Sequence, residues 1–470
     1  MARPSVTSRL QGIERLRRQV LAHPRAQGIS PDEVRDFLSR LPPRRFPRTA
    51  YAERGPIPYT QPRGGFPTFE AQRNLTQALS QSGADFIPLT IDSYTRHNQY
   101  ETATQLLRRS EEEGRDYLNG YPLVSHGHEL TRELYSGLDK PVSLRHGTPD
   151  ARLLAEVAIA SGIVEIEGGG ICYCLPYSEG FPIDRALLYW QYVDRVCAEH
   201  STAAAPIHRE SFGPLSATLV PPAIAIAIEI IEALLAAEQG VVSFAVSFGQ
   251  TGSFVQDIAT AQVLRRLSRR YLDECGFDNV RLYLVYHQWM GAFPQQRPKA
   301  AALISGAAII AGLVDADKVV VKTVDEALGV PRPEVNAEAV DTVQYVMRIF
   351  RGADTITSPV VQREAELIGA EVDSILAAIF ELSGGAFWES VFRAFQLGYL
   401  DVPFAPHADN ANKLISMRDG NGSIRILNPG NVPLSDRSAA MERSLLESRV
   451  DRADKTYRQL LADINLMVQP

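Results

Sequence analysis

The stretch Pro141-Val-Ser-Leu-Arg-His-Gly-Thr-Pro-Asp150 joins an apolar, strand-like segment directly to an arginine, a histidine and a glycine. A helix-like run follows over residues 150–161. Parallel strands that are covered on both faces read as apolar runs, and each needs a crossover helix to reach the next parallel strand. The stretch therefore predicts a strand–helix unit whose strand ends in a guanidinium group.

The same unit recurs along the chain. Strand-like runs occur at 85–91, 121–125, 141–145, 163–167, 206–210, 241–247, 281–287 and 318–322. Helix-like runs follow them at 99–114, 128–137, 150–161, 184–200, 223–238, 253–275, 298–314 and 335–352. Eight strand–helix units predict an α/β fold, a closed (β/α)8 TIM barrel rather than an open doubly wound sheet.

Three regions are expected along the chain: an N-terminal arm over 1–60, a barrel over 61–352 and a C-terminal extension over 353–470. The arm is polar and rich in arginine and proline, with short helices predicted at about 7–22 and 31–40. In the extension we expect helices at about 359–382, 386–399 and 436–463, and a hairpin turn at Asp419-Gly-Asn-Gly422.

Composition excludes several classes of protein. The formal net charge is −7, so no basic surface suggests a nucleic-acid partner. The longest uncharged apolar run, Ala300 to Val314, is too short to span a bilayer, and we expect no membrane association. There is no secretory signal, and four cysteines in 470 residues imply no disulfide framework. We therefore expect a cytoplasmic protein.

Polar residues gather at the predicted strand ends, where TIM barrels place their active sites, and the strand starts are expected to lack them. Arg96 and Arg145 are expected at the ends of the first and third strands, and Arg63 lies in a turn-like stretch before the barrel. Arginine binds carboxylates bidentately, so converging arginines predict a small dianionic substrate. The alternative is that each arginine pairs with a structural carboxylate.

The fourth and eighth strands also carry ionisable residues. Of Glu165 and Glu167, we expect only Glu167 to point into the barrel, where it could bind a substrate ammonium, act as a base or form an internal salt bridge. Lys322 could form a Schiff base or donate to a cofactor. His126-Gly-His128 and Cys172-Tyr-Cys174 match no ligand spacing, so no metal site is predicted.

Long motifs carry a resemblance that covers roughly residues 50–450. They are Gln61-Pro-Arg63, Thr90-Ile-Asp-Ser-Tyr-Thr-Arg96, Leu118-Asn-Gly120, Arg145-His-Gly-Thr-Pro-Asp150, Glu167-Gly-Gly-Gly170, Phe212-Gly-Pro214, Thr218-Leu-Val-Pro-Pro222, Leu234-Leu-Ala-Ala-Glu-Gln-Gly240, His287-Gln-Trp-Met-Gly291, Val321-Lys-Thr323 and Val402-Pro-Phe-Ala-Pro406. In these motifs the chain resembles the epsilon subunit of glutamate mutase, or methylaspartate mutase, a family of coenzyme-B12 isomerases.

The resemblance implies a barrel enzyme that interconverts L-glutamate and (2S,3S)-3-methylaspartate by radical chemistry with adenosylcobalamin. It implies that the substrate is bound by Arg63, Arg96, Arg145, His146, Glu167, Tyr173 and Tyr177. It implies that the cofactor is contacted by Gly65, Asn119, Pro176, Phe293, Lys322, Glu326 and Val330. Lys322 thereby becomes a cofactor contact rather than a Schiff base.

The resemblance also implies a partner. None of the nine histidines has an aspartate two positions before it, so the family's D-x-H-x-x-G cobalamin motif does not occur in this chain. The lower cobalt ligand is therefore expected from a small cobalamin-binding subunit that carries this motif. Two large subunits, as a homodimer, and two small ones are expected to form a heterotetramer.

Three positions depart from the family pattern. Cys174 stands where the family tends to have Asn, Val324-Asp325 where it has Pro-His, and Gly252-Ser253 where it has Gly-Asn. Two alternatives therefore stay open. One is a related B12-dependent mutase for another small carboxylic acid, and the other is a catalytically silent paralogue that binds a partner subunit.

Overall fold

The computed structural model describes residues 12–214, 219–350, 358–382, 385–447, 449 and 456–468. Eight parallel strands are hydrogen-bonded in the order β1-β8-β7-β6-β5-β4-β3-β2. Their bounds are β1 Tyr59–Gln61, β2 Ile87–Thr90, β3 Val142–Arg145, β4 Glu165–Glu167, β5 His208–Glu210, β6 Ser243–Gly249, β7 Arg281–His287 and β8 Lys318–Val320.

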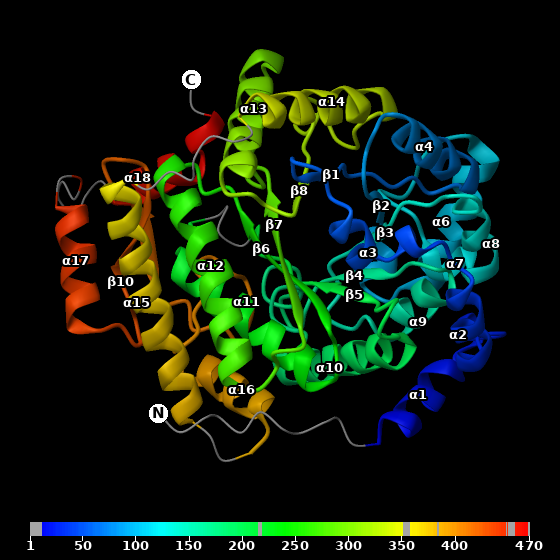
Figure 1. The fold of residues 1–470 in the computed structure, drawn as a ribbon, viewed down its shortest axis with the longest axis horizontal. Helices are drawn as coiled ribbons and strands as arrows, with labels where there is room; N and C mark the ends of the chain where they lie inside the picture. Colours follow the sequence, from blue (N-terminus) through cyan, green and yellow to red (C-terminus); the bar gives the residue numbers. More distant parts are fainter. Residues whose placement is uncertain are drawn as a thin grey trace.

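Backbone bonds between the first and last members of this order close the cylinder. Thr60 O accepts from Asp85 N at 3.0 Å and from Phe86 N at 3.1 Å, and Gly64 O accepts from Thr90 N at 3.0 Å. Helices surround the strands (Figure 1). The predicted (β/α)8 barrel is confirmed.

Eight helices follow the predicted runs: α6 Tyr100–Glu113, α8 His128–Leu134, α9 Arg152–Ala160, α10 Ile183–His200, α11 Pro222–Glu238, α12 Phe254–Glu274, α13 Arg297–Leu313 and α14 Pro333–Phe350. Three helices have no predicted counterpart: α4 Phe69–Gln81, α5 Ser93–Arg96 and α7 Leu123–His126, which overlaps the predicted strand 121–125. Among these described residues, no helix is long and apolar enough to cross a membrane.

One predicted strand is wrong and one real strand was missed. Tyr121 makes only an isolated bridge to Ile91, and the chain then turns at Pro122 into α7, so 121–125 is not a strand. The missing strand is β1, three residues between Pro58 and Pro62. Three residues are too few to show the alternation of apolar and polar side chains that indicates a strand, and the prolines on both sides predict a turn.

The N-terminal residues contact the barrel. They form α1 Ile13–Leu21, α2 Pro31–Ser39 and α3 Pro47–Ala52, whereas residues 7–11 of the predicted first helix lie outside the described part. On α3, the Tyr51 ring stacks on Tyr283 with centroids 4.3 Å apart and packs against Phe86 and His208. Phe86 directly precedes β2, His208 begins β5 and Tyr283 lies near the start of β7, so α3 covers the end of the barrel where the strands begin.

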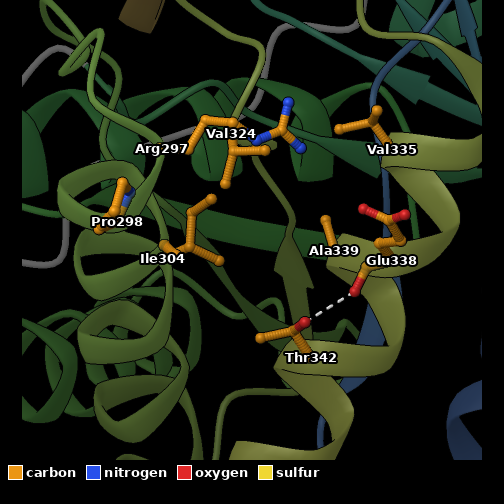
Figure 2. Close-up of a pocket in the computed structure, with 9 residues that line it drawn as sticks. Arg297, Pro298, Ile304, Val324, Val335, Glu338, Ala339 and Thr342 are labelled. Carbon is orange, nitrogen blue, oxygen red and sulfur yellow. Dashed lines mark hydrogen bonds between the residues drawn. The ribbon is translucent and has the colours of Figure 1, made fainter.

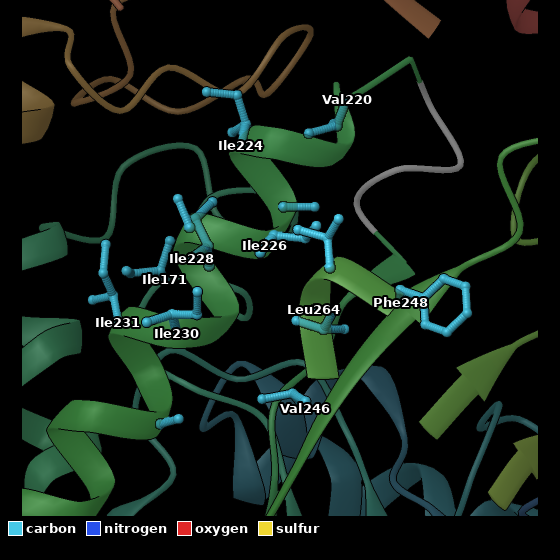
Figure 3. Close-up of a cluster of buried hydrophobic side chains, with 14 of the residues drawn as sticks. Ile171, Val220, Ile224, Ile226, Ile228, Ile230, Ile231, Val246, Phe248 and Leu264 are labelled. Carbon is cyan, nitrogen blue, oxygen red and sulfur yellow. The ribbon is translucent and has the colours of Figure 1, made fainter. Parts of the chain in front are cut away.

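Helix α11 is buried on every side, in agreement with its nearly continuous apolar sequence. Its isoleucines pack against β6 and α12 (Figure 3). Helices α15 Pro359–Glu381 and α16 Phe387–Leu397 contact it from the outside (Figure 1). A second layer of helices explains why this barrel helix has no polar face.

The rest of the C-terminal region partly matches expectation. The predicted hairpin is confirmed as β9 Ile415–Arg418 and β10 Ile424–Asn428, which pair antiparallel. The prediction of a single helix over 436–463 is wrong, because two helices are present: α17 Asp436–Leu446 and α18 Thr456–Ile464. Residues 448 and 450–455, like the predicted 352/353 boundary, lie outside the described residues.

Candidate active site

Arg145, Arg96 and the segment that carries Arg63 all contact the backbone at Thr90 and Ile91, at the carboxyl end of β2. Ile91 N donates to Arg145 O at 2.9 Å, and Ile91 O accepts from Arg96 Nε at 2.7 Å. Arg96 itself lies at the end of the short helix α5, so its predicted place at a strand end is wrong. The Arg63 segment follows β1 and lies against Thr90: a side chain on Gly65 would bring its Cβ within 2.2 Å of Thr90 O.

Arg96 is held near other polar groups without a carboxylate partner. Burial lowers the pKa of Arg96, the nearby Tyr173 and Tyr177 raise it, and Arg63 lowers it again. Within the described part of the chain, no carboxylate lies within salt-bridge distance of Arg96. Its Nη donors therefore remain available at the mouth of the barrel.

Arg145 is paired on one side only. Its Nη1 forms ion pairs with Glu167 Oε1 and with Glu210 Oε1, the latter at 2.9 Å. Burial opposes the charge, but these carboxylates and Glu165 raise the pKa of Arg145 above its usual value. Among the described residues, Nε and Nη2 have no hydrogen-bond partner although both are buried. This free edge is the one that binds a carboxylate bidentately.

Glu167 lies within an aromatic wall. Tyr173 OH donates to Glu167 Oε2, and the Tyr173 ring meets His146 edge to face at 4.8 Å. Tyr177 packs on Tyr173 at 5.7 Å and is 37% exposed. Burial raises the pKa of Glu167, and Arg145 lowers it. Five of the predicted substrate residues thus form one contiguous group.

The glycines after β4 make this wall possible. Gly168 has φ of 120°, and a Cβ there would lie 2.3 Å from the Tyr173 ring. The backbone can therefore turn beneath the ring only because position 168 has no side chain.

Beneath Arg145 lies a buried charge cluster. Lys318 Nζ donates to Gln61 Oε1 at 2.8 Å, to Glu210 Oε2 at 2.7 Å and to Glu165 Oε1. Burial raises the pKa of Glu165 to about 7, and Lys318 opposes that shift. We define Lys318, Glu165, Glu210 and Gln61 as the floor of the site.

The floor overturns two expectations. Glu165 and Glu167 both point inward, because residues two apart on a strand share a face. The expectation of polar-free strand starts is also wrong, since Glu165, His208 and Lys318 begin β4, β5 and β8.

Sequence reasoning missed Glu210, His287 and Lys318 as site residues. The signal for Glu210 was available: it ends β5, and Arg209 before it points outward to Asp194 Oδ1 at 2.6 Å. Lys318 could have been noticed as one of six lysines in the chain, buried in an apolar strand. His287 ends β7 and is buried.

Two of the predicted cofactor residues, Lys322 and Glu326, contact each other next to Arg63. Lys322 Nζ donates to Glu326 Oε2 at 2.7 Å, and Arg63 Nη1 is 3.8 Å from the same oxygen. Burial, helped by Arg63, lowers the pKa of Lys322 to about 8. Asn119 Oδ1 accepts from Ser93 N at 2.9 Å. The structure thus gathers part of this set, while Phe293 is buried, Pro176 is half-buried and Val330 is exposed.

A separate cavity of about 300 Å³ lies between α13 and α14 (Figure 2). Its lining includes Val324, two residues after Lys322, and Arg297 at the start of α13. Apolar side chains of Ile304 and Val335 face it from the two helices. The cavity therefore adjoins the predicted site without being part of it.

The three departures from the family pattern each have local partners. Cys174 is buried, with Sγ 3.3 Å from His407 Nε2. Asp325 forms ion pairs with Arg297 at 3.1 Å and Arg332 at 3.4 Å. Ser253 caps α12 through Gln256 N. None of these contacts involves Arg63, Arg96, Arg145 or Glu167.

Comparison with known proteins gives a consistent result. The family described as Methylaspartate mutase E chain (MutE) matches residues 46–469. The glutamate mutase epsilon subunit of Treponema denticola is 40% identical over 92% of this chain and 90% of its own. The protein of the same name from Halobacterium salinarum is 42% identical over 91% of this chain and 90% of its own length. That from Yersinia enterocolitica is 41% identical over 87% of this chain and 85% of its own length.

Proposed function

The chain belongs to the methylaspartate mutase E chain family, and on that premise we propose that it is the large catalytic subunit of an adenosylcobalamin-dependent glutamate mutase. The reaction would interconvert L-glutamate and (2S,3S)-3-methylaspartate in the cytoplasm. One observation carries the proposal: Arg145 presents an unpartnered guanidinium edge beside Arg96, which has no carboxylate partner among the described residues.

In this proposal the arginines hold the two substrate carboxylates. Arg145 Nε and Nη2 would bind one carboxylate, and Arg96 and Arg63 at the mouth would bind the other. Two carboxylates held by rigid planar groups fix the carbons between them, which limits the motion of a reactive intermediate. Glu167 would accept from the substrate ammonium, while His146, Tyr173 and Tyr177 exclude water from that side.

Lys322 and Glu326 fit a nucleoside-bearing cofactor. Lys322 has three N–H donors, one of which goes to Glu326 Oε2, so both groups can bind ribose hydroxyls. Gly65, Asn119, Pro176, Phe293 and Val330 would complete the contact. When bound, adenosylcobalamin supplies the radical that starts the hydrogen transfer.

We further propose that cobalamin binding needs a partner. The partner would be a small subunit with a D-x-H-x-x-G motif, two copies joining two copies of this chain. Equilibrium dialysis of the isolated chain should show no tight stoichiometric cobalamin binding, and tight binding would contradict this part of the proposal.

The function is tested by incubating the chain with adenosylcobalamin, a small subunit carrying that motif, and L-glutamate. Formation of 3-methylaspartate is the expected result. Turnover of a different small carboxylic acid, with none of glutamate, would favour the related mutase. Absence of turnover with a stable complex would favour the silent paralogue.

A further inference from the structure

Two kinds of buried atom that make no hydrogen bond lie within the described part of the site. Arg145 contributes the donors Nε and Nη2, as described above. Within the described part of the chain, Glu210 Oε1 and His287 Nε2 are also buried and make no hydrogen bond of normal geometry. Glu210 Oε1 has only the ion pair with Arg145 Nη1 at 2.9 Å, and His287 Nε2 lies 3.7 Å from the same oxygen. Unsatisfied polar atoms are costly in a protein interior, so their concentration here indicates a ligand that brings complementary groups.

The acceptors have the geometry of an ammonium site. Glu167, Glu210 and His287 each offer one atom, and the three atoms lie within 4.8 Å of one another. An ammonium with tetrahedral N–H bonds and acceptors about 2.8 Å away separates those acceptors by about 4.6 Å. Three acceptors also match the three N–H donors of a primary ammonium.

The charges agree with this geometry. Above about pH 7, where Glu165 is ionised because its pKa is raised to about 7, the carboxylates Glu165, Glu167 and Glu210 exceed the paired cations Arg145 and Lys318 by one charge. One ammonium would balance the cluster. A divalent metal ion would instead add two charges beside Arg145 Nη1 and Lys318 Nζ.

Resting on the proposed function, we infer that Glu210 and His287, together with Glu167, form an ammonium site that selects an amino dicarboxylate over a plain dicarboxylate. The carboxylate that takes the Arg145 edge and the ammonium that takes these acceptors then belong to one zwitterionic α-amino acid. His287 accepts in the tautomer that carries its proton on Nδ1. Its ring is fixed by edge-to-face packing on Phe212 at 5.5 Å.

The test uses the enzyme assembled with its small subunit and adenosylcobalamin. L-glutamate is the substrate, and glutarate, which lacks the ammonium, is a competitive inhibitor. In Glu210→Gln, the KM for glutamate should rise at least tenfold, while the inhibition constant of glutarate changes less than threefold. Equal changes in both constants, or none, would overturn the inference.

Two further variants guard against misfolding and indirect effects. His287→Gln should shift the same ratio in the same direction by a smaller factor. Glu165→Gln, which contacts Lys318 but is outside the acceptor trio, should shift the ratio by less than Glu210→Gln, because it removes a charge without removing an acceptor. A ratio that changes equally in Glu165→Gln would point to a general loss of charge and contradict the assignment.

Failure of the proposed function can be told apart from failure of this inference. If the wild-type complex turns over no glutamate, calorimetry on that complex still compares binding of glutamate with binding of glutarate. Preference for glutamate that Glu210→Gln abolishes would support the ammonium site without turnover. Equal binding of both by the wild type would overturn it.

Discussion

The floor and the mouth of the barrel hold cations that are buried to a similar degree but partnered differently. Lys318 in the floor uses all three N–H donors, on Gln61, Glu165 and Glu210. Arg145 at the mouth pairs through Nη1 alone and keeps two donors unpartnered among the described residues. Saturated donors indicate a structural charge, and unsaturated ones indicate a charge that awaits a ligand.

The strongest test of this contrast removes the floor cation. Lys318→Met keeps a side chain of similar length but removes the ammonium group that pairs with Glu165 and Glu210. Breaking a buried pair by removing one partner costs about 3–5 kcal/mol, so we expect a loss of that order in the free energy of unfolding. Urea denaturation measures it, with Lys299→Met on the exposed surface of α13 as the control. Equal stability of the two variants would remove the structural role of the floor.

Sequence reasoning reached the mouth more easily than the floor, for a physical reason. Arg145 and Glu167 end strands, and parallel strand ends meet at one edge of a barrel, so position alone predicts their proximity. The Lys318 cluster depends on which residues of distant strands share an interior layer, and that register is not visible in one strand. β1 was hidden because three residues between prolines have no period.

At the mouth, Glu167→Gln should keep the fold and reduce turnover. An amide fills the same volume and can still accept from Tyr173 OH, but it loses the charge opposite a substrate ammonium. A charge-assisted hydrogen bond is worth about 1.5–3 kcal/mol, so kcat/KM should fall roughly tenfold to a hundredfold. Steady-state kinetics measures this. Unchanged kinetics in a folded, cofactor-loaded variant would return Glu167 to a purely structural salt bridge.

Arg145, at the mouth, also contacts the floor through Glu210, so its variant should affect both activity and stability. Arg145→Lys keeps the charge near Glu167 and Glu210 but loses the planar edge. We expect kcat/KM to fall more than tenfold, about 1.4 kcal/mol or greater, together with a lower melting temperature. The loss of stability is expected because Arg145 forms ion pairs with Glu167 and Glu210. A destabilised variant with normal kinetics would exclude Arg145 from the site.

The floor should also respond to pH. Because burial raises the pKa of Glu165 to about 7, the folded protein keeps a proton that the unfolded chain releases from about pH 4.5 upward. The free energy of unfolding should therefore fall as pH rises through this window, by at most about 1.4 kcal/mol per pH unit for one proton. Asp257 and Glu442, whose pKa values are also raised to about 7, act in the same direction. The contribution of Glu165 is the difference between the free energies of unfolding of wild type and Glu165→Gln, measured as a function of pH. If the two curves run parallel, the pKa of Glu165 is not raised in the folded protein.

The smallest effect on stability is expected at Arg96, and it gives the cleanest separation of the two kinds of cation. The side chain makes one hydrogen bond, from Nε to Ile91 O, and no carboxylate pairs with it among the described residues. Arg96→Lys should therefore cost about 1 kcal/mol of stability or less. The KM for glutamate should nevertheless rise more than tenfold, because lysine cannot bind a carboxylate bidentately.

Arg209→Lys is the matched control: Arg209 is buried and pairs with Asp194 on the outside of the barrel, so its variant should lose stability and keep normal kinetics. Because Arg96 and Arg145 would hold one ligand, their double variant should lose less binding energy than the sum of the single losses. Additive losses would mean that the two arginines do not share a substrate, and the contrast between floor and mouth would then rest on Arg145 alone.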